Sequence, residues 1–170
     1  MLERKINMSK TLVVFYSYSG NTKLVAERIS NKLSCDLLEI KPEVAFSSDY
    51  QTVVDEWQNN SIKRDVKIKD INVNLDLYDK IVIGTPIWWY TISPVITSFI
   101  KKYDLKDKTV YPFYTSAGWF GRADTDFRKL CESDKIKECL KVTFDSDYSN
   151  HLIISNESEI NLWINKIEKE

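Results

Sequence analysis

Three short stretches of this 170-residue sequence combine hydroxyl, amide or aromatic side chains with a glycine inside the stretch or directly before it, and each follows a predicted β-strand. The first stretch is Ser17-Tyr18-Ser19-Gly20-Asn21-Thr22. It brings hydroxyls, an amide and free backbone N–H groups to the start of a predicted helix, where the helix dipole favours a phosphate without lysine or arginine. Ordinary capped turns use the same residue types, so both interpretations stay open at this point. The spacing of a P-loop or of a dinucleotide fingerprint is missing.

The second stretch places three aromatic residues in a row at the end of a predicted buried strand. It is Thr85-Pro86-Ile87-Trp88-Trp89-Tyr90. Adjacent side chains cannot all face inward, so the three rings cannot all be core. One or two of them are expected to line a cleft or meet solvent, and an aromatic wall suits a planar ring ligand. A hydrophobic cap over helix ends or a contact between two copies of the chain would use the same residues.

The third stretch again mixes small residues with aromatic ones. It is Thr115-Ser116-Ala117-Gly118-Trp119-Phe120-Gly121-Arg122. Small residues let backbone amides approach a ligand closely, and the two aromatic rings would cover it. Arg122 is expected either at the polar edge of such a ring or on the solvated surface. Because ligands of open α/β sheets bind outside the carboxyl ends of the strands, the glycines of these stretches, with Gly84, predict one shared site.

The elements that must position these stretches alternate between strand and helix patterns. Short runs rich in apolar residues predict strands over Thr11–Tyr16, Cys35–Ile40, Lys80–Gly84, Thr109–Tyr114 and Glu138–Phe144. Helical spacing and caps predict helices over Thr22–Leu33 and Asp49–Asn60 and others that start at Ser93, Asp124 and Asn156. Residues 61–79 are expected to form a long irregular connection. This alternation implies an α/β fold with a parallel sheet covered by helices on both faces.

Composition narrows the class of protein. Hydrophobic residues make up 43% and charged residues 29%, and 24 basic against 25 acidic residues leave a net charge of −1. Without a basic or acidic field, neither nucleic acid nor anionic lipid is expected as a partner. No apolar run is long enough for a signal peptide or a membrane-spanning helix. We expect residues 1–9 to be an N-terminal extension and residues 10–170 to form one domain.

The remaining reactive side chains are interpreted as structural or solvated. Cys35, Cys131 and Cys139 form no CxxC motif and cannot all pair, which indicates reduced thiols and a cytoplasmic location. His151, the single histidine, lacks acidic or thiol partners at ligand spacing and is expected on the surface. No metal site and no catalytic acid or base is predicted. Asp145 and Asp147 are expected to be solvated acids. Trp57 and Trp163 are expected to pack in the core.

Taken together, the three stretches resemble the FMN-binding loops of flavodoxin-like proteins. Ser17–Thr22 matches the family's Ser/Thr-x-Ser/Thr-Gly-Asn-Thr phosphate loop. Gly84–Trp89, followed by Ser93-Pro94, is similar to the Gly-x-Pro-Ile-Trp-Trp segment of one bacterial flavodoxin branch. Thr115–Gly118 resembles the family's Thr-Ser-Gly-type loop. The resemblance spans about Lys10 to Lys166, nearly the whole chain.

The resemblance implies a three-layer sandwich with a five-stranded parallel sheet of order 2-1-3-4-5 and FMN at the switch point between the first and third strands. The phosphate would rest on the first stretch, and the isoalloxazine would lie against Trp88 or Trp89, with Trp119 as a further contact. The implied cofactor-binding residues are Ser17, Tyr18, Ser19, Gly20, Asn21, Thr22, Thr85, Pro86, Ile87, Trp88, Trp89, Ser116, Ala117, Gly118, Trp119 and Gly121. Ala117 and the bulky Trp119-Phe120 pair depart from the small residues usual in the family.

The function that the resemblance implies first is that of an FMN-dependent, low-potential electron-transfer protein. The alternative is an FMN-dependent NAD(P)H:quinone or nitro-compound oxidoreductase, because the second stretch is also similar to the Pro-Leu-Trp-Trp-type segment of quinone reductases. The near-neutral charge fits an enzyme as well, whereas typical carrier flavodoxins are strongly acidic. A third interpretation is a binding module that keeps the fold without flavin. Redox proteins or small quinone-like acceptors are the expected partners of a monomer or homodimer.

Overall fold

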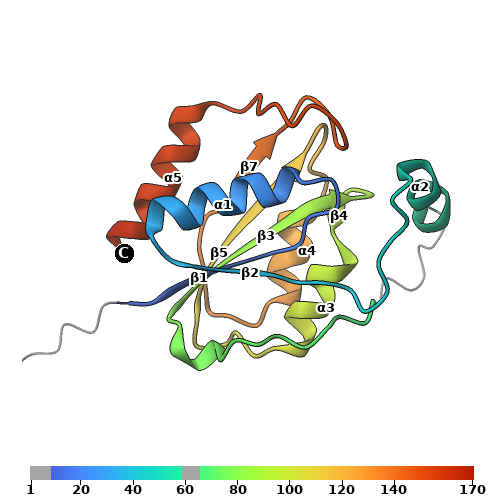
Figure 1. Ribbon diagram of the computed structural model, residues 1–170. Helices are drawn as coiled ribbons and strands as arrows, with labels where there is room; N and C mark the ends of the chain where they lie inside the picture. The colour runs from blue at the N-terminus through green and yellow to red at the C-terminus, as the bar shows by residue number, and fades with distance from the viewer. Residues whose placement is uncertain (1–8, 59–65) are drawn as a thin grey trace, which may run out of the picture.

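The central strands are apolar along almost their whole length, so they are stable only between two layers of helices. β1 (Thr11–Phe15), β3 (Lys80–Trp88) and β5 (Thr109–Ser116) form the middle of a parallel sheet. The computed structural model describes residues 9–58 and 66–170, and all elements named below lie within them (Figure 1).

The described residues contain seven strands, and the order along the sheet is β2-β1-β3-β5-β6. β2 (Asp36–Glu39) pairs with β1, while β6 (Lys135–Ile136) and β7 (Leu140–Thr143) both pair with β5. β4 (Thr91–Ile92) is an additional antiparallel strand on β3. The predicted arrangement of five parallel positions is therefore present, but the predicted count of five strands is wrong, because the fifth position is divided and β4 is added.

The fifth position is divided because the chain between β6 and β7 makes other hydrogen bonds. The Glu138 carbonyl accepts a hydrogen bond from the Trp163 indole N–H at 2.8 Å. This bond attaches residue 138 to the last helix, so the ladder with β5 resumes only at Leu140. The predicted core position of Trp163 is confirmed by its burial.

β3 continues past Gly84, where its predicted end lies, because both of its later neighbours pair with it. Pro86 pairs with Thr115 of β5, and Trp88 pairs with Thr91 of β4. The two residues between β3 and β4, Trp89 and Tyr90, have φ values of 47° and 68°. These left-handed values are uncommon for aromatic residues and make the reversal tight. The second stretch is thus a strand end and a hairpin.

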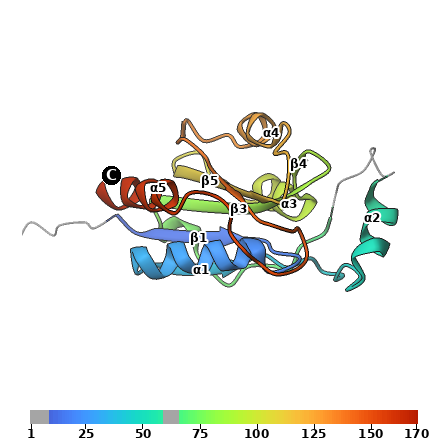
Figure 2. The same cartoon turned by 90° about the horizontal axis from the view of Figure 1, so that it is seen from above.

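Helices cover both faces of the sheet: α1 (Asn21–Leu33) and α5 (Glu157–Lys169) on one, α3 (Pro94–Lys102) and α4 (Ala123–Leu130) on the other. Alternate residues of β1 divide between the two cores. Val13 and Phe15 pack with α1 and α5, whereas Leu12 and Val14 belong to the core that includes α3 and α4. Figure 2 shows α1 and α4 on opposite sides of the sheet. The predicted three-layer α/β sandwich is confirmed.

Of the three helix starts predicted at Ser93, Asp124 and Asn156, the structure confirms two. α3 begins directly after Ser93 and α5 directly after Asn156, as predicted. Asp124 was expected to cap the fourth helix, but α4 already begins at Ala123. The Asp124 carboxylate instead accepts a hydrogen bond from the Tyr114 hydroxyl at 2.9 Å, because that buried phenol needs an acceptor.

α2 (Tyr50–Gln58) stands beside the carboxyl ends of the strands instead of covering either face (Figure 1). The end of the predicted helix, 59–60, and the first part of the predicted connection, 61–65, lie outside the described residues. Residues 66–79 contain one 3-10 turn, Leu75–Leu77, and a single bridge between Ile68 and Pro42. Within the described part of the chain, no helix is long and apolar enough to cross a membrane.

Candidate functional site

The three stretches meet at the carboxyl ends of β1, β3 and β5, around a cavity of about 340 Å³. We call this space the central cavity. Among the predicted site residues, those that line it are Tyr18, Ser19, Pro86, Ile87, Trp88, Trp89, Ser116, Gly118 and Trp119. Side chains from outside the predicted set complete the wall, namely Tyr50, Val53, Val54, Tyr90 and Asp147. The structure therefore brings the three stretches together in one place, with α2 as an unexpected fourth wall.

The segment Ser17–Thr22, here called the phosphate loop, turns directly into α1. Gly20 precedes the helix with a φ of 107°, which favours glycine. The Ser17 hydroxyl oxygen accepts hydrogen bonds from the Gly20 N–H at 3.1 Å and the Lys23 N–H at 3.2 Å. Ser17 thus shapes the turn itself. The amides at the start of α1 form the partly positive end of a helix dipole.

Two side chains of the phosphate loop, both predicted phosphate ligands, point into the protein. Asn21 donates to the Ser146 carbonyl at 2.8 Å, and its side-chain oxygen bonds to His151 Nδ1. The Thr22 and Thr115 hydroxyls are 2.8 Å apart and fully buried. These bonds anchor the loop to β5 and to the β7–α5 connection. Asn21 and Thr22 therefore offer a ligand their backbone N–H groups.

Trp88 and Trp89 form an aromatic wall of the central cavity. Trp88 is 8% exposed and packs against Phe46 at 4.9 Å and Trp57 at 6.1 Å between ring centroids. Trp89 is half-buried and meets Trp88 edge to face at 5.7 Å. Because Trp88 is enclosed on several sides, its position is fixed by packing. The contacts of Trp57 with this wall agree with its predicted packing role.

Tyr90 and Trp119 form the outer rim of the site. Their ring centroids are 5.2 Å apart, and Trp119 is 72% exposed. Gly121 lies behind them with a φ of 56°, and a β-carbon there would be 2.3 Å from the Tyr90 carbonyl oxygen. The same carbonyl accepts a hydrogen bond from the Arg122 N–H at 2.8 Å. Gly121 thus joins the second and third stretches and lies outside the wall of the central cavity.

The amides of the third stretch, predicted to hold the edge of the ring, already have partners. The Ala117 N–H donates to the Asp147 carboxylate at 2.7 Å, and the Gly118 N–H to the Ser116 hydroxyl at 3.1 Å. A β-carbon on Gly118 would meet no described atom within 4 Å, so this part of the stretch is open. A ring edge bound here would replace those two bonds with its own.

Two further predicted contributors lie away from the cavity. Gly84 is needed for packing, because a β-carbon there would lie 2.0 Å from the Phe113 ring. The Arg122 guanidinium is 72% exposed and pairs with Asp126 at 2.9 Å. Of the two positions left open for Arg122, the structure has the solvated one.

Sequence reasoning missed Asp147 and His151 as parts of the site. Both are in the connection after β7, which ends at the same edge of the sheet as the three stretches. Asp147 lines the central cavity, and His151, although exposed as predicted, contacts the phosphate loop. The only available sequence signal was their position after a predicted strand. That signal does not say which side chains of a polar connection turn inward.

The phenols around the site stay protonated at neutral pH. Burial, with a smaller contribution from Asp49, raises the pKa of Tyr18, and burial followed by Asp147 raises the pKa of Tyr50. The buried Tyr16 hydroxyl, behind Trp88, likewise has a raised pKa because burial disfavours its anion. These side chains can therefore donate hydrogen bonds but not act as bases.

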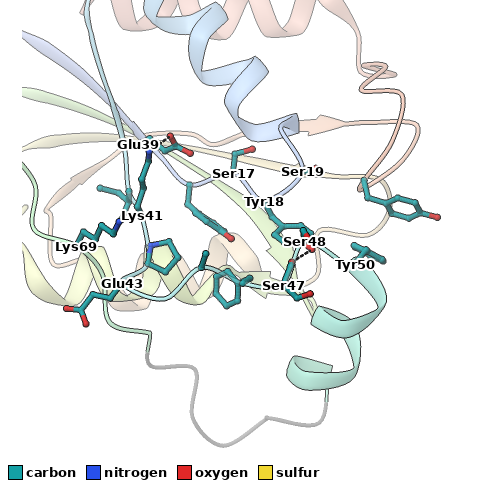
Figure 3. Close-up of a pocket in the computed structure, with 16 residues that line it drawn as sticks. Ser17, Tyr18, Ser19, Glu39, Lys41, Glu43, Ser47, Ser48, Tyr50 and Lys69 are labelled. Atoms are coloured by element: carbon teal, nitrogen blue, oxygen red, sulfur yellow. Dashed lines mark hydrogen bonds and ion pairs between the residues drawn. The ribbon is translucent and has the colours of Figure 1, made fainter.

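A second cavity of about 560 Å³ adjoins the central cavity at Tyr18 and is here called the outer cavity (Figure 3). It shares Tyr18, Ser19 and Tyr50 with the central cavity. Its far wall is the segment after β2, where Lys41 pairs with Glu39 at 3.7 Å. The Tyr18 hydroxyl donates to the Ser47 carbonyl at 2.7 Å, which fixes this shared side chain.

The comparison with protein families decides the classification. A model of the flavodoxin family matches residues 10–167. The chain belongs to the flavodoxin family. None of the curated proteins compared with this flavodoxin matches it.

Solved structures with the same fold include proteins described as flavoproteins. One from Bacteroides eggerthii is 28% identical with a TM-score of 0.72, over 94% of this chain and 98% of that one. A flavoprotein from Lactobacillus acidophilus, solved in complex with FMN, is 26% identical with a TM-score of 0.61, over 91% of this chain and 98% of that one. An archaeal flavodoxin at 16% identity and a TM-score of 0.54, covering 94% of this chain and 96% of that chain, shares the fold.

The residues of the site fit FMN. The phosphate loop offers backbone N–H groups at a helix N-terminus, and Gly20, directly before the helix, adds no side chain of its own there. The central cavity beside it has tryptophan walls and an open position at Gly118. A ligand with a planar ring at one end and a phosphate at the other matches these two features.

Proposed function

We propose that the protein binds FMN across the phosphate loop and the central cavity and acts as a low-potential electron-transfer protein. The observation that carries the proposal is adjacency: a cavity walled by Trp88 and Trp89 opens beside a helix N-terminus that needs no basic side chain to hold a phosphate. Membership of the flavodoxin family and the FMN complex of the Lactobacillus acidophilus flavoprotein support the same cofactor.

Bound FMN would supply the redox chemistry, and the protein would orient it and control access to it. The backbone N–H groups of the phosphate loop would hold the phosphate. Trp88 and Trp89 would flank the ring, and their apolar surfaces would exclude water. Trp119 and Tyr90 lie at the exposed rim, where a redox partner protein or a small quinone-like acceptor would approach.

The charges around the central cavity favour a low reduction potential. Among the described residues that line the cavity, Asp147 alone carries a carboxylate, and its negative charge opposes the addition of electrons to a nearby ring. Arg122, which would oppose this effect, is paired with Asp126 and faces solvent. Apart from Asp147, the ionisable groups lining the cavity are phenols, two of which have raised pKa values. Electron transfer needs no general base, so this set of side chains suits a carrier.

A reductase remains the second candidate function because of the outer cavity. It adjoins the central cavity through Tyr18, Ser19 and Tyr50, and its volume of about 560 Å³ leaves room for part of a second ligand such as NAD(P)H. In that case hydride would pass from NAD(P)H to FMN and then to a quinone or nitro compound. The carrier is preferred because the two lysines that line the outer cavity, Lys41 and Lys69, are balanced there by Glu39 and Glu43, so the cavity offers no excess of positive charge to a dinucleotide phosphate.

The first test is the visible spectrum of the purified protein after incubation with FMN and desalting. Retained and shifted flavin bands, with quenched tryptophan fluorescence from Trp88 and Trp89, are expected. A colourless protein whose fluorescence ignores FMN would refute both flavin functions and leave a binding module with this fold. Anaerobic addition of NAD(P)H then separates the candidates: a carrier stays oxidised on the turnover timescale, whereas rapid bleaching identifies the reductase.

A further inference from the structure

The imidazole of His151 covers the glycine of the phosphate loop. His151 Nδ1 is 2.5 Å from the Asn21 side-chain oxygen. A β-carbon on Gly20 would be 3.6 Å from His151 Cε1 and 4.0 Å from Nε2. The ring therefore lies in contact with the turn that precedes α1, although its sequence position is far from that turn.

The connection between β7 and α5 is built so that the ring reaches this position. Asn150 and His151 have φ values of 64° and 55°, left-handed values that are uncommon for residues other than glycine but that asparagine and histidine adopt more readily than most. The Asp145 carboxylate fixes the reversal by accepting the Leu152 N–H at 3.0 Å, and the Ser149 carbonyl accepts the His151 N–H at 2.8 Å. Local strain is thus compensated by specific hydrogen bonds.

The hydrogen-bond pattern assigns roles to the atoms. The Asn21 amide nitrogen donates to the Ser146 carbonyl at 2.8 Å, so its oxygen is the atom that faces the imidazole. A carbonyl oxygen only accepts, so His151 Nδ1 must carry the hydrogen and donate it. Asn21 is 5% exposed and is the first residue of α1. The imidazole therefore fixes Asn21, whose backbone N–H is the first of helix α1.

We propose that His151 is a positioning residue of the phosphate site, which acts through Asn21 to hold the phosphate loop in its binding conformation. The inference rests on the proposed FMN function and extends it to a residue outside the three stretches. A preorganised loop does not have to be ordered when the ligand binds, so His151 contributes to the affinity for the phosphate group in particular. It contributes little to the affinity for the ring.

Riboflavin has the ring and ribityl chain of FMN without the phosphate, so the two ligands separate these effects. Dissociation constants of both are measured by fluorescence titration of the full chain. His151→Gly removes the imidazole and tolerates the left-handed backbone. We expect its Kd for FMN to rise about tenfold, a typical loss for a hydrogen bond that supports a charged group, and its Kd for riboflavin to change by less than about twofold.

Two further variants complete the design. His151→Asn also tolerates the left-handed backbone and can still donate to Asn21, so it should keep the Kd for FMN within about threefold of the native value. Leu152→Ala changes an exposed neighbour in the same connection and should leave both constants unchanged.

Each contrary result has a distinct meaning. If His151→Gly raised the Kd for FMN and the Kd for riboflavin equally, or raised neither, the positioning role would be overturned. If His151→Asn raised the Kd for FMN as much as His151→Gly does, the route through Asn21 would be overturned. If the native protein bound neither FMN nor riboflavin, the proposed function itself would fail. This outcome is separate from any result obtained with the variants.

Discussion

At the scale of single residues, Gly84 and the glycines of the three stretches have different structural roles, although all four follow predicted strands in the sequence. Gly20 provides the left-handed turn before α1, and Gly118 leaves an opening at the central cavity. Gly84 and Gly121 are required because neighbouring atoms occupy the space of a β-carbon. Only the first two bear directly on a ligand.

Replacing Gly121 should destabilise the fold, whereas the same change at Gly118 should not. In Gly121→Ala the new β-carbon meets the Tyr90 carbonyl oxygen, and the left-handed backbone adds strain, so a loss of about 1–3 kcal/mol is expected. Gly118→Ala has free space and should stay within about 0.5 kcal/mol of the native protein. Urea denaturation of both variants measures this, and equal losses would contradict the assignment.

The thiols should be unreactive in the folded protein. Burial, followed by the charge of a neighbouring aspartate, raises the pKa of Cys35 and of Cys139 to about 11. Because alkylation needs the thiolate, both groups should react slowly at pH 8, and the rate should rise about tenfold per pH unit and level off only near pH 11. Reaction with iodoacetamide, followed by mass spectrometry, tests this; the urea-unfolded chain is the fast control. Rapid labelling of the folded protein at pH 8 would be the contrary finding.

At the scale of elements, the segment around α2 is the least supported wall of the site. Within α2 only Val53 is buried, and aromatic pairs hold the rest of the helix: Trp57 packs against Phe46 at 5.3 Å and against Trp88, and Tyr50 packs against Tyr148 at 4.5 Å between ring centroids. Elements with few buried contacts open more readily than the sheet. We therefore expect the α2 side of the central cavity to open more readily than the side formed by β3 and β5.

Trp57→Ala should loosen this segment alone. Removing the indole deletes its edge-to-face contacts, so backbone hydrogen exchange in residues 43–58 should accelerate severalfold while that of β1 stays unchanged. Gln51→Ala, which removes only an exposed hydrogen bond to Asp55 on the same helix, is the matched control. Faster exchange throughout β1 and β3 would instead show that Trp57 supports the whole core.

The sequence predicts an element well where one hydrophobic period, that of a strand or of a helix, dominates. It predicts an element poorly where a side chain from another element takes one of the backbone hydrogen bonds. The β1–α1 unit follows from an apolar run and a helical stripe. The break between β6 and β7 does not, because it depends on the Trp163 indole reaching the Glu138 carbonyl from another helix. The three loops could be predicted as one site because the carboxyl ends of parallel strands share an edge. The inward turn of Asp147 and His151 could not, since it results from long-range hydrogen bonds.

At the scale of the whole molecule, the near-neutral net charge means that this flavodoxin lacks the strong electrostatic field that steers a highly charged carrier toward its partner. The net charge is −1, and oppositely charged side chains often lie side by side, as in the Lys10–Asp36 and Lys166–Glu138 pairs. Such a surface gives little long-range steering. Recognition of a redox partner would then depend on short-range contacts at the Tyr90–Trp119 rim.

Electron transfer from the FMN-loaded protein should therefore depend only weakly on salt. Between ionic strengths of about 0.01 M and 0.15 M, the second-order rate with a charged small-molecule acceptor is expected to change by less than about threefold. Stopped-flow absorbance with one anionic and one cationic acceptor measures it. A steep, opposite dependence for the two acceptors would reveal a local field that the net charge conceals.

The link between Gly121, Arg122 and the Tyr90 carbonyl has a kinetic consequence. It makes the β3–β4 hairpin and the third stretch one mechanical unit, so a ring cannot enter by pushing them apart. A ring would instead enter through the opening beside Gly118 or after displacement of the α2 side. If the α2 side has to move first, association would be gated by a local fluctuation, and its rate would level off as the flavin concentration rises. Variants that loosen α2 would speed both capture and escape of the cofactor while leaving the equilibrium between them nearly unchanged.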